Sequence, residues 1–344
     1  MSNLPPSGEI PRGAIRFNTD SNKPELWDGS QWAEFQLSTP NLGRSVDTEP
    51  GARGVISEVH RSGSTGFITY INISSTGNAQ DFGALTNPRA NAEPVGSQTR
   101  GVFGAGYVPS PSNASINVIE FVTIASTGSV TDFGDTLNPN YVPGAVSSST
   151  RGIWGGGANL PAAPTLIDVM QYVTIASTGN TVDFGNLTDG CWCSAGVESP
   201  TRGIFAQGFI PSVVNNLDFI TISTLGNAQD FGDLTVARAG TSGAGNKVRG
   251  LFMGGYNPTV LNVIDYITMA STGDAANFGD LTQVARFGGA TSDSRRALLC
   301  GRYTPSASNV IDYVQIMTEG DAIDFGDCTS ETQAAATSSG HGGL

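Results

Sequence analysis

The sequence has 344 residues, enough for one large all-β domain, and carries 30 Asp and Glu against 17 Lys and Arg, a formal net charge of −13. This charge, without a basic cluster, argues against nucleic-acid binding through phosphates, and no apolar run approaches the roughly 18 residues of a membrane-spanning helix. Abundant glycine (45 residues) beside 14% charged residues is typical of many short strands joined by tight turns.

The chain begins with an N-terminal tail, residues 1–11, that lacks the apolar stretch of a secretory signal. Residues 12–37 then predict short strands. Arg12–Phe17 resembles the second strand of the repeat described below, and a hairpin that turns at Asp28-Gly29 follows it.

From about residue 44 the chain repeats itself with a period of 47 to 51 residues. An Asp-Phe-Gly triplet marks each period, and an Arg that opens a short apolar run follows each of the first five triplets 19 residues later. All length variation falls between the Arg and the next triplet, as expected for a loop on one face of a repeat. The triplets begin at Asp81, Asp132, Asp183, Asp230, Asn277 and Asp324, and the Arg residues are Arg53, Arg100, Arg151, Arg202, Arg249 and Arg296.

Each unit predicts four antiparallel strands. A stretch of small residues such as Ala239–Gly245 comes first, followed by the run that opens with the Arg, an apolar strand of the type NVIDYITMAS, and a short strand with the triplet. A Gly in the turn between the last two strands, usually Ser-Thr-Gly, supplies the positive φ of a tight hairpin. Four strands in a unit of this length are typical of a propeller blade, and the 3.6-residue period of helical repeats is absent. The expected units are 44–85, 89–136, 141–187, 192–234, 238–281 and 286–327.

The C-terminal residues 334–341 resemble the small-residue first strand of a unit. Together with the strands of residues 12–37 they predict a seventh blade built from both chain ends, which would close the ring and leave no exposed strand edge. Residues 12–344 would then form one all-β propeller. The alternative is a propeller of six blades with a separate N-terminal hairpin.

The unit resembles a kelch repeat. The likeness rests on an Arg early in the first strand (Arg238), a double Gly ending the second strand (Gly254-Gly255), an aromatic residue beside an acid in the third strand, and an aromatic residue in the fourth. Phe stands in the fourth strand where kelch repeats usually have Trp, and Phe103–Gly106 breaks the double Gly. The resemblance implies a kelch-like β-propeller and carries no activity with it.

The N-terminal segment GAIRFNTDSNKPELWDGSQWAEF has a likeness of its own. It resembles a short β-meander found in tail-fibre and other virion proteins of marine and cyanobacterial phages, which implies that this chain is part of a phage particle. The residues that match the pattern are Gly13, Ile15, Arg16, Phe17, Asn18, Thr19, Asp20, Asp28, Gly29 and Trp32.

The recurring acids are candidate ligands or structural residues. The triplet Asp and a second acid three positions on, such as Asp132 and Asp135, could offer paired carboxylates to Ca²⁺. A residue that recurs in every unit more often serves the unit itself, so we expect the triplet Asp to cap a turn or pair with the recurring Arg. Acids of the third strand, such as Glu120 and Asp265, are expected to accept hydrogen bonds from backbone or Arg, beside aromatic rings that pack between blades.

The connections after the second strand vary most in length, which favours a recognition face. They carry aromatic and Pro residues that could stack on sugars or fill a pocket of a protein partner, although packing that anchors the loop is the commoner role of such residues. The candidate binding-face residues are Tyr107, Pro109, Trp154, Phe209, Tyr256 and Tyr303.

The sequence shows no catalytic constellation. His60 and His341, the two histidines, do not stand at a metal-ligand spacing, no nucleophile has a supporting base, and the glycine runs lack the GK[ST] of a phosphate loop. The four cysteines do not recur at one repeat position, so reduced thiols are expected. We therefore expect no metal, no cofactor and no enzymatic activity, with a propeller enzyme as the least favoured class.

These observations predict a non-enzymatic structural and binding protein of a phage virion, in a tail fibre, a tail tip or a capsid decoration. It would be made in the host cytoplasm and present in copies set by particle symmetry. The expected partners are other virion proteins and a glycan or protein of the host surface, without nucleic acid and without membrane insertion. The alternative is a cytoplasmic, kelch-like scaffold for protein interactions.

Overall fold

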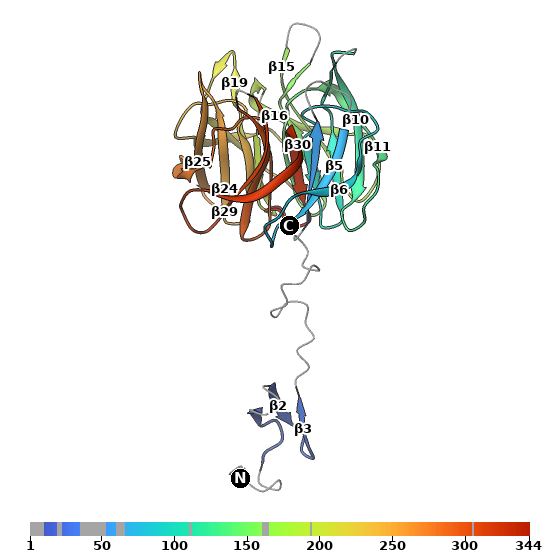
Figure 1. Ribbon diagram of the computed structural model, residues 1–344, viewed down its shortest axis with the longest axis vertical. Coiled ribbons are helices and arrows are strands. Elements are labelled where there is room, and N and C mark those ends of the chain that lie inside the picture. Colours follow the sequence, from blue (N-terminus) through green and yellow to red (C-terminus); the bar gives the residue numbers. More distant parts are fainter. Residues whose placement is uncertain are drawn as a thin grey trace. The chain divides into compact units, whose positions relative to one another are not determined.

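The computed structural model describes residues 10–18, 23–34, 53–59, 66–109, 112–159, 165–192, 195–304 and 306–344. These residues form strands and turns without an α-helix (Figure 1), and among them no helix is long and apolar enough to cross a membrane. The chain divides into two compact units, Met1–Glu49 and Pro50–Leu344. Each unit is considered by itself.

The first unit contains a small antiparallel sheet with the strand order β1 (Ile15–Asn18), β2 (Lys23–Trp27) and β3 (Trp32–Glu34). The predicted turn at Asp28-Gly29 is confirmed. The Asp28 carboxylate accepts hydrogen bonds from the backbone N–H groups of Ser30 and Gln31, at 2.7 and 2.8 Å. These bonds favour the charged carboxylate and lower its pKa.

The second unit repeats one antiparallel sheet of four strands. In the most regular copy, β23 (Ser242–Gly245), β24 (Arg249–Tyr256), β25 (Val260–Thr268) and β26 (Ala276–Asp280) pair in chain order. Three further sheets follow the same plan: β7 (Pro94–Gly96), β8 (Arg100–Gly104), β10 (Ala114–Thr123) and β11 (Thr131–Asn140); β12 (Gly144–Ser147), β13 (Arg151–Gly155), β15 (Thr165–Thr174) and β16 (Val182–Cys191); and β17 (Ala195–Glu198), β18 (Arg202–Ala206), β21 (Asn216–Thr221) and β22 (Gln229–Asp233).

Short strands extend the connections between the second and third strands of these sheets. They are β9 (Tyr107–Val108), which pairs with β10, β14 (Ala158–Asn159), which pairs with β15, and β19 (Phe209–Ile210), which pairs with β20 (Ser212–Val213). The four-stranded plan agrees with the order predicted from the repeat, since each described unit has its Arg at the start of the second strand. The positive φ expected at the Ser-Thr-Gly turn is also confirmed, for example 149° at Gly273.

The last sheet joins the two ends of the second unit. β27 (Gly289–Ser292), β28 (Arg296–Tyr303) and β29 (Ala307–Gln315) lead into the long β30 (Ile323–Ser338), whose second half pairs with β4 (Arg53–Val59), followed by β5 (Gly66–Asn72) and β6 (Gln80–Ala84). The C-terminal strand thus completes the sheet that contains Arg53.

This pairing corrects the expected partner of residues 334–341. They were expected to join the strands of residues 12–37, but β1, β2 and β3 pair with one another, and the C-terminal strand pairs with β4 instead. The register runs without a bulge from Gln333 opposite Val59 to Ser338 opposite Gly54, so β4 offers a complete edge. Residues 35–52, where the first strand of unit 44–85 was expected, lie outside the described residues.

The innermost strands of these sheets surround one cavity. In turn, β7 contacts β12, β12 contacts β17, β17 contacts β23, β23 contacts β27, β27 contacts β30, and β30 contacts β7. Figure 1 shows the sheets standing side by side, with β30 in the same sheet as β5 and β6. The second unit is therefore a propeller-like all-β fold built from four-stranded antiparallel sheets.

Hydrophobic cores fill the spaces between neighbouring sheets, because alternate residues of a strand point to opposite faces. On β21, Leu217 packs toward β24 and β25, whereas Ile220 packs toward β13 and β15. The third strand of the unit is thus apolar on both faces, as its sequence predicted, and each sheet is held by two neighbours.

Candidate functional site

The recurring Arg of the second strand joins neighbouring sheets. Its guanidinium lies over the aromatic ring of the third strand in its own sheet, as Arg202 does over Phe219 at 4.7 Å. Its Nη1 donates to a backbone carbonyl of the next sheet, as Arg202 does to Met269 at 3.0 Å. The same bond runs from Arg53 to Ile124, Arg100 to Ile175, Arg151 to Ile222, Arg249 to Ile316, and Arg296 to Ile73.

The pairing of the triplet Asp with this Arg was predicted, and it is wrong within the described part of the chain. The ion pairs there involve other carboxylates. The Arg is already engaged by an aromatic ring and a carbonyl, so the Asp is left at the surface. The exposed residues of the triplet are Asp81, Asp132, Asp183, Asp230, Asn277 and Asp324.

The other two residues of the triplet explain why it recurs. The Phe231 ring is buried edge-on against Phe219 at 6.1 Å, and its carbonyl accepts a hydrogen bond from Gly273 N–H of the next sheet at 2.8 Å. A Cβ on Gly232 would lie 2.6 Å from the backbone of Gly273. The triplet therefore serves contact between sheets. No cluster of three or more His, Cys, Asp or Glu side chains suited to a metal occurs among the described residues.

The acids of the third strand form a second kind of contact between sheets. Asp265 accepts hydrogen bonds from both the N–H and the hydroxyl of Thr235 on the preceding sheet, and pairs with Arg238 at 2.8 Å. Both charged groups are fully buried; burial lowers the pKa of Arg238, and the Asp265 charge opposes that shift. This agrees with the predicted role of these acids.

The partners of the buried acid differ from sheet to sheet. Asp218 is met by Gln207 and Thr188 instead of an Arg, and burial raises its pKa while these hydrogen bonds act against the rise. Of the other third-strand acids, Glu120 bonds with Arg89 and Thr86, and Asp312 bonds with Arg302 and Thr282. On β15 the amide of Gln171 takes the place of the acid and accepts from Thr181 and Leu137. In the sheet of β4 the acid comes from the second strand, where Glu58 accepts from Thr69, Thr329 and Ser330.

Aromatic residues gather where the first strand begins and the second strand ends. Tyr107, Tyr141, Trp192 and Phe209 follow one another with ring centroids 5.4, 6.2 and 5.7 Å apart. Arg286 lies 4.8 Å over the rings of both Tyr256 and Tyr303 and 5.6 Å over Phe287. We call these residues the aromatic face: Tyr107, Tyr141, Trp192, Phe209, Tyr256, Arg286, Phe287 and Tyr303.

The predicted binding-face residues fall into two groups in the structure. Tyr107, Phe209 and Tyr303 are half-buried members of the aromatic face, and Tyr256 is 37% exposed. The other two lie elsewhere, because Pro109 is buried and Trp154 lies in the core between sheets.

Trp154 follows the recurring Arg by three positions on β13 and therefore faces the neighbouring sheet. Its Nε1–H donates to the carbonyl of Glu93 at 2.8 Å, and its ring lies so close to Gly104 that a Cβ there would be 2.6 Å away. A buried ring with a satisfied N–H is typical of a core Trp.

Sequence reasoning missed Tyr141, Trp192, Arg286 and Phe287, which belong to the connection before the first strand. Isolated bridges place the first three directly beside the second-strand connections, for example Trp192 opposite Phe209 and Arg286 opposite Tyr303. For Tyr141, Trp192 and Arg286 a signal was available, because other units have Ala90 and Ala239 at this position.

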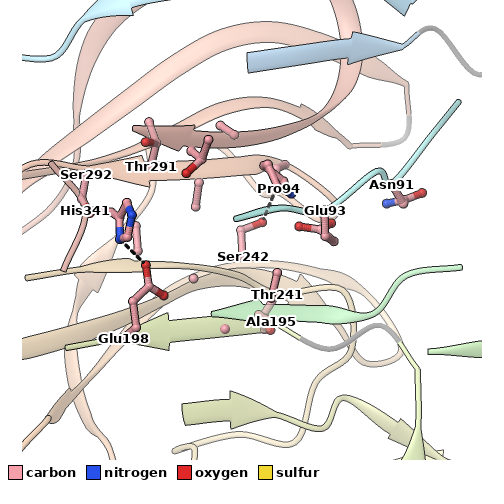
Figure 2. Close-up of a pocket in the computed structure, with 18 of the residues that line it drawn as sticks. Asn91, Glu93, Pro94, Ala195, Glu198, Thr241, Ser242, Thr291, Ser292 and His341 are labelled. Carbon is pink, nitrogen blue, oxygen red and sulfur yellow. Dashed lines mark hydrogen bonds and ion pairs between the residues drawn. The ribbon is translucent and has the colours of Figure 1, made fainter. Parts of the chain in front are cut away.

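The cavity between the innermost strands is lined mainly by Gly, Ala, Ser and Thr. Its titratable lining residues are Glu93, Glu198 and His341, within the part of the chain that the structure describes (Figure 2). Glu93 is exceptional, since the strand registers place small residues at its position in the other sheets: Gly144, Ala195, Ser242, Gly289 and Ala335.

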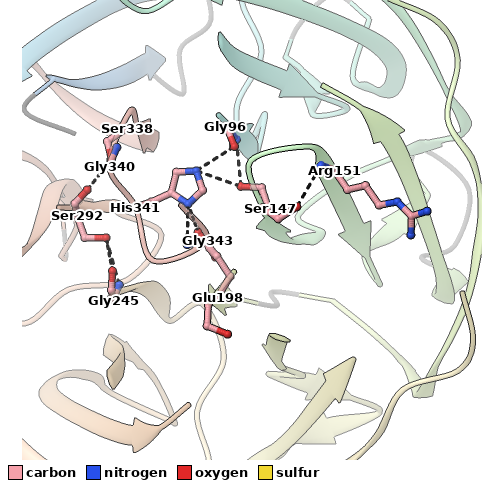
Figure 3. A network of polar contacts seen from close by, with 12 residues as sticks. Gly96, Ser147, Arg151, Glu198, Gly245, Ser292, Ser338, Gly340, His341 and Gly343 are labelled. Carbon is pink, nitrogen blue, oxygen red and sulfur yellow. Dashed lines mark hydrogen bonds and ion pairs between the residues drawn. The ribbon is translucent and has the colours of Figure 1, made fainter. Parts of the chain in front are cut away.

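The last residues of the chain lie at the opposite end of this cavity from the aromatic face. The Nδ1 atom of His341 lies 2.8 Å from a carboxylate oxygen of Glu198, and its Nε2 donates to the carbonyl of Gly96 at 2.9 Å (Figure 3). A Cβ on Gly342 or Gly343 would overlap neighbouring backbone. The C-terminal tail therefore fills the end of the cavity where the first strands end, which we call the turn end. The sequence did not predict this role for His341.

Cys300 and Cys328 are buried with free thiols, and burial raises the pKa of both. A raised pKa keeps a thiol protonated and unreactive at neutral pH. Cys193 lies outside the described residues.

Neither a protein-family model nor a curated protein matches this chain. Its function is therefore inferred from its own residues. The described part offers two candidate surfaces, the aromatic face and the cavity beneath it.

Proposed function

We propose that Pro50–Leu344 is a closed, kelch-like propeller of six blades, and that residues 12–34 form a separate docking segment. The support is that contacts between sheets run through successive sheets and return to the first. Gly77 N–H donates to the Phe325 carbonyl at 2.9 Å, Arg296 donates to Ile73 at 3.1 Å, and Thr329 donates to Glu58 at 3.2 Å. Such cycles are expected of a ring without a free edge.

The same proposal makes this propeller a non-enzymatic binding protein of a phage virion, which attaches to a host-surface glycan through the aromatic face. The aromatic face carries the proposal. Its rings are partly exposed and held by strands, and rigid aromatic side chains bind with little loss of conformational entropy. The virion placement rests on the resemblance of the N-terminal segment to phage proteins, and other virion proteins are its proposed partners there.

Mass spectrometry and cryo-electron microscopy of purified particles of the source phage test the placement. The expected result is this chain in the particle, at tens of copies or more if it decorates the head and at fewer if it belongs to the tail. Its absence from particles would overturn the virion placement and favour the cellular kelch-like scaffold.

Glycan-array binding by single-residue variants tests whether the aromatic face is the binding surface. Phe209→Ala and Tyr256→Ala should each weaken binding roughly tenfold, because central aromatic anchors contribute more than about 1 kcal/mol. Leu225→Ala is the matched control, since Leu225 is a 53% exposed apolar residue in a turn at the other end of the sheets. Equal effects of all three variants would rule out the aromatic face as the binding surface.

A further inference from the structure

Glu93 is a carboxyl group without a counter-charge. It lines the inner cavity, and no ion pair of the described residues includes it. The residue is half-buried, and the loss of solvent around its carboxyl group raises the pKa to about 8. Its backbone is held firmly, since its carbonyl accepts the indole N–H of Trp154. The fold therefore places a costly acid where every other sheet has a small residue.

Two hydroxyl groups in the same cavity also lack partners. Thr241 is 6% exposed and Thr291 is 3% exposed, both line the cavity, and neither Oγ1 has a hydrogen-bond partner. Ser242 donates its hydroxyl to the Gly288 carbonyl at 2.7 Å, which leaves its oxygen free to accept. Figure 2 shows Glu93, Thr241 and Ser242 directed toward the same space. Buried polar atoms are normally satisfied, so this group of acceptors points to a ligand.

The chemistry of these groups selects the ligand. One carboxylate with several hydroxyl oxygens offers a single negative charge and several hydrogen-bond acceptors, which suits a cation that carries N–H donors. A divalent metal would need more oxygen ligands with charge, and the second acid of the cavity, Glu198, is already paired with His341 at the turn end.

The approach to the site is apolar. Val142 and Phe287 line the same cavity and pack in the cluster that includes Tyr141, Trp192 and Phe209. An aliphatic chain fits against such residues, and aromatic rings attract cations. The C-terminal tail occupies the other end of the cavity, so the aromatic face is the side from which a ligand would enter.

We infer that the inner cavity binds a primary ammonium group on an aliphatic chain, with Glu93 as its counter-charge and Thr241 and Ser242 as further acceptors. The ammonium could come from a free small amine or from a lysine side chain of a partner. The inference is independent of the virion placement and of glycan binding, because Glu93 lies below the aromatic face and its variants leave the surface rings unchanged.

Affinity should depend on pH in a defined direction. The cation requires ionised Glu93, which is protonated in the empty site below its pKa of about 8. Affinity should therefore increase as pH rises from 6 to 8 and level off above that, with a proton released on binding at pH 7. Glu198 and His341 are the other titratable groups of the described cavity lining, and they are paired with each other at its turn end.

Isothermal titration calorimetry of the full chain with n-butylammonium chloride tests the inference. Glu93→Gln should weaken binding roughly tenfold or more and remove the pH dependence, since a charge-assisted hydrogen bond is lost while shape is kept. Glu93→Ala introduces the residue that two other sheets carry at this position and should fold, so it secures the test if the Gln variant does not.

Two further probes identify the source of the ammonium. N-acetyl-lysine methylamide that binds as tightly as n-butylammonium would indicate a lysine of a partner, and binding of n-butylammonium alone would indicate a free amine. Equal binding by the wild type and both Glu93 variants, no binding of any amine, or full displacement by potassium chloride at equal concentration would each overturn the inference.

Discussion

Neighbouring sheets are joined differently at the two ends of their strands. At the turn end, the recurring contacts use backbone groups: the recurring Arg donates to a carbonyl, and the turn Gly donates to the carbonyl of the triplet Phe. At the loop end, the third-strand acid accepts hydrogen bonds from a Thr that follows the preceding sheet, as Asp265 does from Thr235. A side chain of the acid's own sheet completes the set, and this residue is Arg238 for Asp265 and Gln207 for Asp218.

The difference explains how the repeat varies. A backbone partner has the same geometry in every unit, so the residues of the turn end recur almost unchanged. A side-chain partner can be exchanged if the hydrogen bonds are still made, so the loop end tolerates new residues. The aromatic face and Glu93 both lie toward the end that varies, as expected of positions open to function.

The largest expected effect comes from a buried acid of the loop end. Asp265→Ala should lower the free energy of unfolding by about 3–5 kcal/mol, because Arg238 is left buried and unpaired. Asp230→Ala removes an exposed acid and should change it by less than about 0.5 kcal/mol. Urea denaturation of both variants measures the difference, and equal effects would contradict the division between buried and exposed acids.

At the turn end, two glycines allow the cost of a strained backbone to be distinguished from the cost of a steric overlap between sheets. Gly232 and Gly273 have similar positive φ values, 141° and 149°, but a Cβ would meet backbone at 2.6 Å on Gly232 and nothing within 4 Å on Gly273. Gly232→Ala should therefore destabilise by about 1–3 kcal/mol more than Gly273→Ala, the usual cost of forced overlap. Thermal denaturation checks this, and equal losses in both variants would exclude close contact between sheets at the triplet.

The contacts of the C-terminal tail at the turn end should contribute less to the free energy of unfolding. His341→Ala should cost about 1.5–2 kcal/mol of unfolding free energy, because a charge-assisted hydrogen bond to Glu198 is lost. A double-mutant cycle with Glu198→Gln isolates the pair, and a coupling energy near zero would show that the tail is held by other contacts.

The smallest expected change, taken over a single pH unit, concerns Glu93. Its pKa is raised from 4.5 to about 8 in the folded protein, so between these values the folded state holds a proton that the unfolded chain has lost. Stability should therefore fall as pH rises through this window, by at most about 1.4 kcal/mol between pH 6 and 7. Glu93→Ala should remove this contribution, whereas the control Glu331→Ala, at an exposed position, should retain the wild-type slope in urea denaturation.

Much of the architecture could be predicted from local pattern. Strand order within a unit follows from the alternation of small, apolar and turn residues, and the positive φ at Gly273 follows from its place in a tight hairpin. The acids of the third strand were also assigned correctly, since an acid within an apolar strand must find donors when it is buried.

The partner of a recurring residue could not be predicted in the same way. The triplet Asp and the recurring Arg both return in the repeating units, and this recurrence suggested that they pair. Recurrence shows that each copy has the same surroundings, but it does not show which side chain lies across the interface. Packing turned Arg202 onto Phe219 and left Asp230 exposed.

The sequence by itself thus determined the four-stranded unit, its turns and the apolar faces of its strands, because these depend on residues close together in the chain. Only the tertiary structure decided that β30 pairs with β4, that Trp154 is buried, and that Glu93 faces Thr241. Each of these contacts joins residues of different units, and it depends on which strand edges and faces meet once the whole chain has folded.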